Sequence, residues 1–116
     1  MKLIIAGSRT INLSTQDLLD IMEVNFDTGS IECIISGGAR GIDTTAHLLA
    51  LEHGCEFMLF KAAWAEHGKP AGHIRSKAMA DAGDVLLLIW DGQSKGSANM
   101  KKNMEKLGKP VIEVIV

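Results

Sequence analysis

The sequence is poor in the residues that mark several protein classes. It has no tyrosine, and aromatic residues make up 4% of its 116 residues, so few rings are available for stacking on the bases of single strands. Its two cysteines, Cys33 and Cys55, lack the spacing of zinc or redox sites. No apolar run reaches the roughly 20 residues of a membrane helix, and residues 1–5 do not lead into a signal-like segment. We therefore expect a reduced, cytoplasmic protein without membrane contact.

The chain carries no excess of positive charge either. Twelve lysines and arginines face fourteen aspartates and glutamates, which gives a formal net charge of -2. A polyanion would feel no long-range attraction to such a chain, so a role in nucleic-acid binding would need a local basic patch. The hydrophobic content of 47% over 116 residues suits a single compact domain, which we expect to span residues 1–116.

Five apolar runs without alternation predict five short parallel strands, each buried on both faces, at residues 3–6, 31–35, 57–60, 85–90 and 111–116. Segments with helical periodicity lie between them. We expect helices that start near Ser14, that cover residues 40–53 and 70–82, and that place Met100, Met104 and Leu107 inward before ending at Gly108. Strands alternating with helices predict a Rossmann-like, doubly wound α/β sheet in the order 3-2-1-4-5, with helices on both faces.

Glycine-bearing loops follow three of the predicted strands. They cover residues 7–9, residues 36–43 (Ser-Gly-Gly-Ala-Arg-Gly-Ile-Asp) and residues 91–97. In this topology they fall on one edge, where free N–H groups and helix dipoles favour anions. The simpler alternative is that the glycines only make tight turns. Neither a GxGxxG nor a GxxxxGK[ST] motif is present, which argues against ordinary dinucleotide and Walker-type sites. We expect the loops to bind phosphate through Gly7, Ser8, Arg9, Ser36, Gly37, Gly38, Arg40, Gly41, Asp43, Asp91, Gly92, Lys95, Gly96 and Ser97.

The loops also carry a family resemblance. The segments at residues 5–9 and 36–43, Trp64 with residues 67–68, residues 71–75 ending in Arg75, and residues 90–96 resemble the YspA-type (DUF2493) members of the SLOG superfamily. The resemblance implies a Rossmann-like fold that binds or processes nucleotides and nucleotide-derived signals. The wider superfamily includes the LOG phosphoribohydrolases and the DNA-processing protein DprA.

The match to the LOG branch breaks at the catalytic acid. Arg75 resembles the LOG arginine, but Met100 stands where that branch has its glutamate. Cleavage of an N-glycosidic bond needs a carboxylate, and the carboxylates that remain as candidates are Asp91 and Glu66, with Asp43 as a further one. Arg75 is the other catalytic candidate. The resemblance therefore favours binding over catalysis.

Several of these residues have a structural alternative. Asp43 suits the first turn of a helix, and Asp91 can cap the loop that follows it or bind a ribose hydroxyl. Arg75 offers a bidentate fork to phosphate or forms a surface ion pair. Trp64 either stacks on a base or packs, within a connection at residues 61–69 that is long enough to serve as a lid.

We conclude from the sequence that the chain binds a nucleotide or a nucleotide-derived phosphorylated ligand, as a sensor would. The alternatives are a LOG-like N-glycosidic hydrolase or transferase and, less favoured, DprA-like binding of single-stranded DNA. We expect no cofactor and no metal, because His47 and His53 are six residues apart and cannot share an ion on one helix face. A homodimer is expected because twofold dimers are the commonest oligomers.

Overall fold

The computed structural model describes residues 1–62, 68 and 70–116. Strands and helices alternate along these residues, as β1 (Lys2–Gly7), α1 (Thr15–Asn25), the 3-10 turn η1 (Thr28–Ser30), β2 (Cys33–Ser36), α2 (Ile42–His53), β3 (Glu56–Leu59), α4 (Ala71–Ala82), β4 (Val85–Trp90), α5 (Lys95–Lys106) and β5 (Val111–Ile115).

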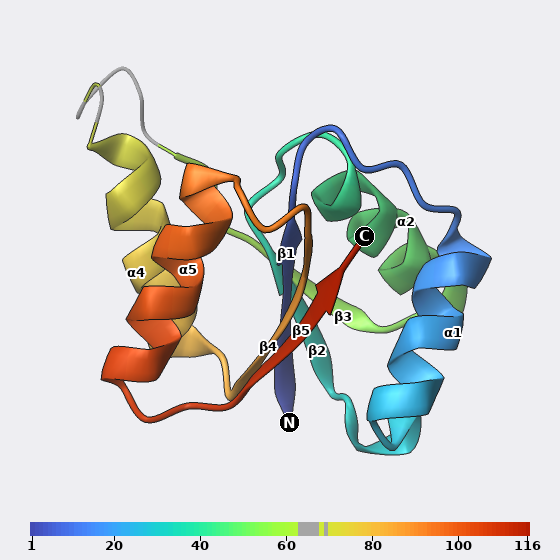
Figure 1. Cartoon of the computed structure of the whole chain (residues 1–116). Coiled ribbons are helices and arrows are strands. Elements are labelled where there is room, and N and C mark those ends of the chain that lie inside the picture. Colours follow the sequence, from blue (N-terminus) through green and yellow to red (C-terminus); the bar gives the residue numbers. More distant parts are fainter. Residues whose placement is uncertain (63–67, 69) are drawn as a thin grey trace.

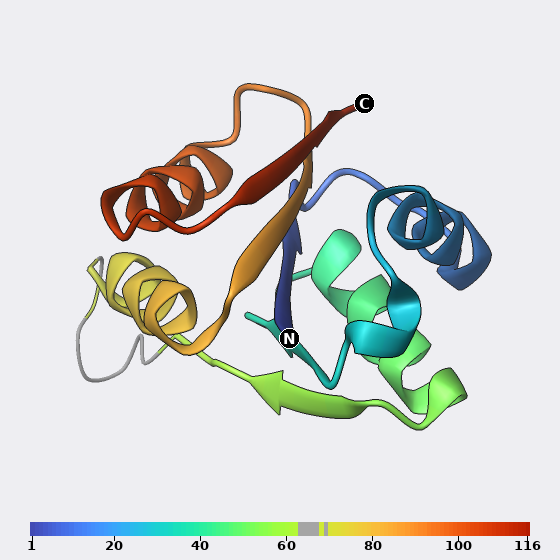
Figure 2. The same cartoon turned by 90° about the horizontal axis from the view of Figure 1, so that it is seen from below.

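The strands form one parallel sheet in the order β3-β2-β1-β4-β5, which confirms the predicted topology. Helices α1 and α2 cover one face of the sheet, and α4 and α5 cover the other (Figures 1 and 2). The strand order reverses at β1, which pairs with β2 on one side and with β4 on the other. In open sheets of this kind, ligands bind beyond the carboxyl ends of the strands at this reversal.

Two hydrophobic cores hold the layers together. One packs alternate residues of the central strands, such as Ile5 and Leu87, against α1 and α2, and the other packs Ile4 and Leu88 against α4 and α5. The prediction that all five strands are buried on both faces is wrong for the two edge strands. Leu59 of β3 is 43% exposed and Ile115 of β5 is 65% exposed. The helices lie mainly over the centre of the sheet, so the edges are covered less.

The helix boundaries follow their capping residues. Ser14 caps α1 through a reciprocal pair of hydrogen bonds with Asp17. Helix α2 begins at Ile42 rather than at residue 40, because Gly41 has a φ of 73° that no helical residue adopts. Leu107 lies beyond the last residue of α5 and is 46% exposed, so its predicted inward position is wrong. None of the helices described is both long and apolar enough to cross a bilayer.

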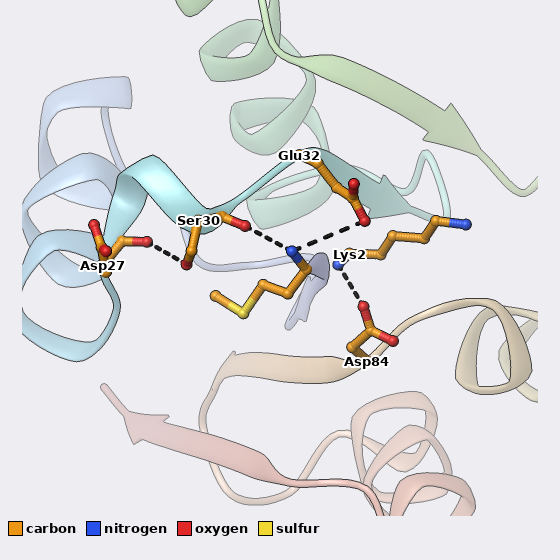
Figure 3. A network of polar contacts seen from close by, with 6 residues as sticks. Lys2, Asp27, Ser30, Glu32 and Asp84 are labelled. Carbon is orange, nitrogen blue, oxygen red and sulfur yellow. Dashed lines mark hydrogen bonds and ion pairs between the residues drawn. The ribbon is translucent and has the colours of Figure 1, made fainter.

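Acidic groups gather where the strands begin (Figure 3). The backbone amide of Lys2 donates to the Asp84 carboxylate at 2.7 Å, and the amino group of Met1 lies 3.9 Å from the Glu32 carboxylate. These contacts tie the start of β1 to the segments that precede β2 and β4. This end of the sheet thus places its carboxylates opposite the loops that carry the predicted phosphate site.

Candidate functional site

The three glycine-bearing loops meet at the carboxyl edge of the sheet and touch one another. A Cβ atom on Gly41 would lie 2.8 to 2.9 Å from the carbonyl oxygens of Ser8, Arg9 and Ile11, so only glycine fits at this crossing. The backbone amide of Asp91 donates to the Ser8 hydroxyl at 3.2 Å. The prediction that the loops share one edge is confirmed, and the loops form one connected unit.

Gly7 makes the closest approach in this unit. A Cβ atom there would overlap the carbonyl oxygen of Ile89 and lie 2.8 Å from Cγ1 of Ile42. The end of β1 therefore sits directly against both β4 and the start of α2. A glycine at this position lets the central loop lie between its two neighbours.

The first cavity at this edge, which we term the basic hollow, has a volume of about 730 Å³. Among the residues that the structure describes, four cationic side chains and no carboxylate line it. Its lining residues come from the loops after β1, β2 and β3 and from α4: Arg9, Thr10, Gly37, Gly38, Ala39, Arg40, Lys61, Ala62 and Arg75. Such a surface attracts anions and offers several donors to phosphate oxygens.

A second cavity of about 370 Å³, which we term the mixed pocket, lies beside the basic hollow. Its lining combines three cations, two carboxylates and an apolar floor that includes Met79 and Met100. The full lining is Ala6, Gly7, Arg9, Thr10, Gly37, Ala39, Asp43, Arg75, Ser76, Met79, Asp91, Ser94, Lys95, Gly96, Ser97 and Met100. Met100 thus faces the site, and it can neither donate nor accept a proton there.

Arg75 belongs to both cavities. Its Nη1 atom donates to the carbonyl oxygen of Gly37 at 3.2 Å, while its Nε atom is buried and has no partner among the described residues. The guanidinium packs closely against Gly37, since a Cβ atom on Gly37 would lie 3.1 Å from Cζ of Arg75. A half-buried arginine that lines both cavities can offer its remaining Nη donors to an anion that enters either one.

Asp43 is 5% exposed and closes the glycine loop from behind. Its Oδ2 atom accepts a hydrogen bond from the Ala39 amide at 3.1 Å. Burial raises the pKa of this carboxyl to about 6, although the Ala39 amide and the Arg75 charge oppose the shift. The structure therefore gives Asp43 a role in holding the loop and also places it in the wall of the mixed pocket.

Asp91 lies at the opposite side of the mixed pocket and caps its own loop. Its Oδ1 atom accepts from the amides of Gln93 and Ser94 at 2.9 and 3.0 Å, which confirms the capping alternative. These N–H groups hold the pKa of the Asp91 carboxyl below its usual value. Ser94 then caps α5 by accepting from the Ser97 amide.

Other predicted residues hold the loops without lining either cavity. Ser36 is fully buried, where its hydroxyl accepts from the Gly38 amide, and Ser8 is 2% exposed. Gly41 and Gly92 also lie outside both linings. Trp64 and Glu66 lie outside the described residues, as does most of the predicted lid. Sequence reasoning missed Lys61, although β3 ends at the same edge and the residues just beyond it were therefore candidates.

An acidic hollow of about 640 Å³ lies at the opposite ends of the strands. Among the described residues its lining includes Glu23, Glu32 and Glu56 but no lysine or arginine. The net charge of -2 thus hides a local excess of cations around the basic hollow.

Comparison with known proteins supplies further findings. The family model described as DNA recombination-mediator protein A matches residues 1–106. The Gene 61 protein of Mycobacterium phage D29 is 38% identical over 85 residues, which are 68% of this chain and 68% of the phage protein.

Two solved structures share the fold. DNA processing protein A (DprA) from Streptococcus pneumoniae matches 97% of this chain with a TM-score of 0.75 and 21% identity. DNA processing protein A from Helicobacter pylori, which is described as having a unique single-stranded DNA binding mode, matches 97% with a TM-score of 0.74 and 19% identity. The chain spans 49% and 64% of these two proteins.

Proposed function

We propose that the chain, because it belongs to the DNA recombination-mediator protein A family, binds single-stranded DNA at the basic hollow. The observation that carries the proposal is the gathering of four cationic side chains around one cavity whose described lining contains no carboxylate: Arg9, Arg40, Lys61 and Arg75. The binding mode described for the Helicobacter pylori protein supports the same ligand.

The net charge of -2 argued against DNA when only the sequence was considered. The net charge averages over the whole surface. A phosphate at the loops interacts mainly with charges closer than the Debye length of about 8 Å, because salt screens the more distant ones. The glutamates at the far end of the strands are screened from it. The basic hollow therefore acts as the local patch that a nucleic-acid role requires.

In this proposal the affinity comes mainly from the DNA backbone. Each phosphate that the cations neutralise releases condensed counterions, so the logarithm of the binding constant falls with the logarithm of salt by about 0.7 per contact on a single strand. Arg75 and Arg9 each offer several N–H donors to phosphate oxygens, and the amides of the glycine loop add neutral donors. The described part of the site contains no aromatic side chain in its linings, so we expect little base stacking there.

The test is a titration of a fluorescent oligothymidylate, followed by anisotropy at several salt concentrations. The double variant Arg40→Gln/Lys61→Gln should bind more weakly and should have a salt slope smaller by about 1.4, which corresponds to two lost contacts. Lys102→Gln is the matched control, because Lys102 is exposed on α5 and lines neither cavity. Equal slopes for the double variant and the control would contradict the proposal.

A second candidate is a free nucleotide or nucleotide-derived phosphate in the mixed pocket. Its support is the lining itself, in which Lys95 and Arg75 are suited to the phosphate and the Asp91 carboxylate is suited to a hydroxyl or amino donor. Calorimetric titration with thymidine monophosphate and ADP-ribose, for the wild type and for Arg75→Ala, distinguishes this candidate. Nucleotide binding in the mixed pocket would be favoured if the small ligands bind saturably, if Arg75→Ala weakens this binding and if the oligonucleotide does not compete with it.

We propose binding rather than cleavage, because Met100 lines the mixed pocket where the LOG branch has its acid. Incubation with nucleoside monophosphates followed by chromatography tests this, since released base would refute it. Membership of the YspA-type branch and a homodimer stay predictions. Light scattering of the purified chain tests the dimer.

A further inference from the structure

We propose that Asp43 determines the charge state that this site accepts, so that binding of a phosphate group beside Arg75 is accompanied by uptake of a proton on Asp43. The inference rests on the proposed function, since it concerns the anion that the two cavities share. It assigns a specificity-determining role to a residue whose ordinary place in the first turn of α2 suggests only helix capping.

The position of Asp43 provides the first argument. Its side chain is almost fully buried, and its Oδ2 atom accepts from the amide of Ala39, a residue that lines both cavities. An anion held by the loop therefore lies just across this loop from a carboxylate that has lost most of its water. Two negative charges in such a poorly solvated place repel each other strongly, unless one of them is neutralised.

Arg75 provides the second argument. It faces Asp43 from α4 across the mixed pocket, and its charge lowers the pKa of that carboxyl. The guanidinium makes one hydrogen bond to a described residue, from Nη1 to the Gly37 carbonyl, so a phosphate can bind its remaining Nη donors without displacing another acceptor. Once a phosphate shares the Arg75 charge, Asp43 is stabilised less in its ionised form.

The other charged groups at the site do not replace Asp43 in this role. Arg9 lines the pocket from the loop after β1, Arg40 lies in the glycine loop, and Lys95 faces it from the start of α5. All three are basic side chains, so none of them supplies a second buried carboxyl group. Asp91, on the loop before α5, has a lowered pKa and stays ionised. No histidine lines either cavity among the residues described.

Burial brings the proton equilibrium of Asp43 into an accessible range, since it raises the pKa of the carboxyl to about 6. A bound phosphate raises that pKa further. Between the free and the bound pKa, linkage requires that the affinity increase by up to about tenfold for each unit of decrease in pH. Phosphodiester groups do not titrate in this range, so the dependence would arise in the protein.

The experiment measures binding of a fluorescent oligothymidylate at constant ionic strength from pH 8.5 to pH 5.5. We expect the wild type to bind about tenfold more tightly at pH 5.5. Asp43→Asn should bind tightly at every pH, with a change below about twofold, because the amide oxygen still accepts from Ala39 without charge. Asp81→Asn is the matched control, because Asp81 is exposed on α4 and lines neither cavity, and it should keep the wild-type dependence.

A calorimetric measurement on the wild type alone guards against misfolding of the variant. Titration at pH 6.5 in buffers of different ionisation enthalpy should show uptake of about half a proton or more per binding event. No uptake, or the same pH dependence in Asp43→Asn and the wild type, overturns the role of Asp43 but leaves DNA binding intact. Absence of binding by every variant at every pH overturns the proposed function, and the inference with it.

Discussion

Replacing Gly37 by alanine should weaken ligand binding while leaving the fold almost unchanged. A Cβ atom at this position would lie 3.1 Å from Cζ and Nε of Arg75 and 3.3 Å from its Cδ. The φ of Gly37 is not in the left-handed region, so alanine fits the backbone without strain. The cost of the substitution therefore falls on the arginine, which must move away from the loop.

The expected loss of affinity follows from the hydrogen bond that holds Arg75 in its position beside the two cavities. The hydrogen bond from Arg75 Nη1 to Gly37 O is 3.2 Å long, and a bond with a charged donor contributes about 1.5 to 3 kcal/mol when its partner is buried. Arg75 is half-buried, so water replaces part of this contribution. We expect affinity for the oligonucleotide to fall about tenfold, which is about 1.4 kcal/mol. The free energy of unfolding should change by less than about 1 kcal/mol, since alanine also restricts the unfolded chain.

Anisotropy titration and urea denaturation on the same samples measure the two effects separately. Gly29→Ala is the matched control, because its Cβ atom would make only an ordinary contact of 3.4 Å with Asp27, far from either cavity. Unchanged affinity in Gly37→Ala would show that the placement of Arg75 does not matter for binding. A loss of stability above about 2 kcal/mol would show instead that the loop cannot adapt.

Three further substitutions test the stability of the fold and the ionisation of Asp43. Lys109→Met should lower the free energy of unfolding in urea by about 2 kcal/mol, because Lys109 Nζ donates to three carbonyls at the end of α4, at 2.7, 2.8 and 3.0 Å; exposed Lys102→Met should change it little. Gly7→Ala should cost more than about 3 kcal/mol through its overlap with Ile89, and a native circular-dichroism melt would refute this. Asp43→Asn should stabilise the fold by up to about 3 kcal/mol at pH 7.5, because a pKa raised from 3.8 to about 6 makes the ionised carboxylate destabilising; the gain should shrink as the pH falls from 6 to 4, and a constant gain would contradict the shift.

Much of the fold follows from simple features of the sequence. Unbroken apolar runs predict buried parallel strands, and all five strands and their order are as predicted. The error at β3 and β5 has a physical reason. A short apolar run such as that at Leu59 has the same pattern in a central strand, which helices cover on both faces, as in an edge strand, which they cover less. Leu107 continues the helical period, but the helix ends one residue earlier.

The site was less predictable than the fold, because lining residues depend on distances between segments. Glycine motifs indicated the edge, and Arg75 was found through its family resemblance. Ser8 and Ser36 were expected to face a ligand, yet the Ser8 hydroxyl accepts from the Asp91 amide of a neighbouring loop and the Ser36 hydroxyl accepts from the Gly38 amide of its own loop. A polar side chain beside a glycine can serve either purpose, and the sequence does not record which one. Lys61 was missed because no motif surrounds it.

The crossing of the loops at Gly41 limits how relatives of this chain can diverge. Since Gly41 touches the backbone of residues 8, 9 and 11, and Ser8 in turn holds Asp91, a loop transplanted alone from a relative would arrive without its matching neighbours. We therefore expect that the three loops must be exchanged as a set. In a chimera that carries all three loops of a donor, ligand preference should travel with the set, while the strands beneath remain those of the recipient.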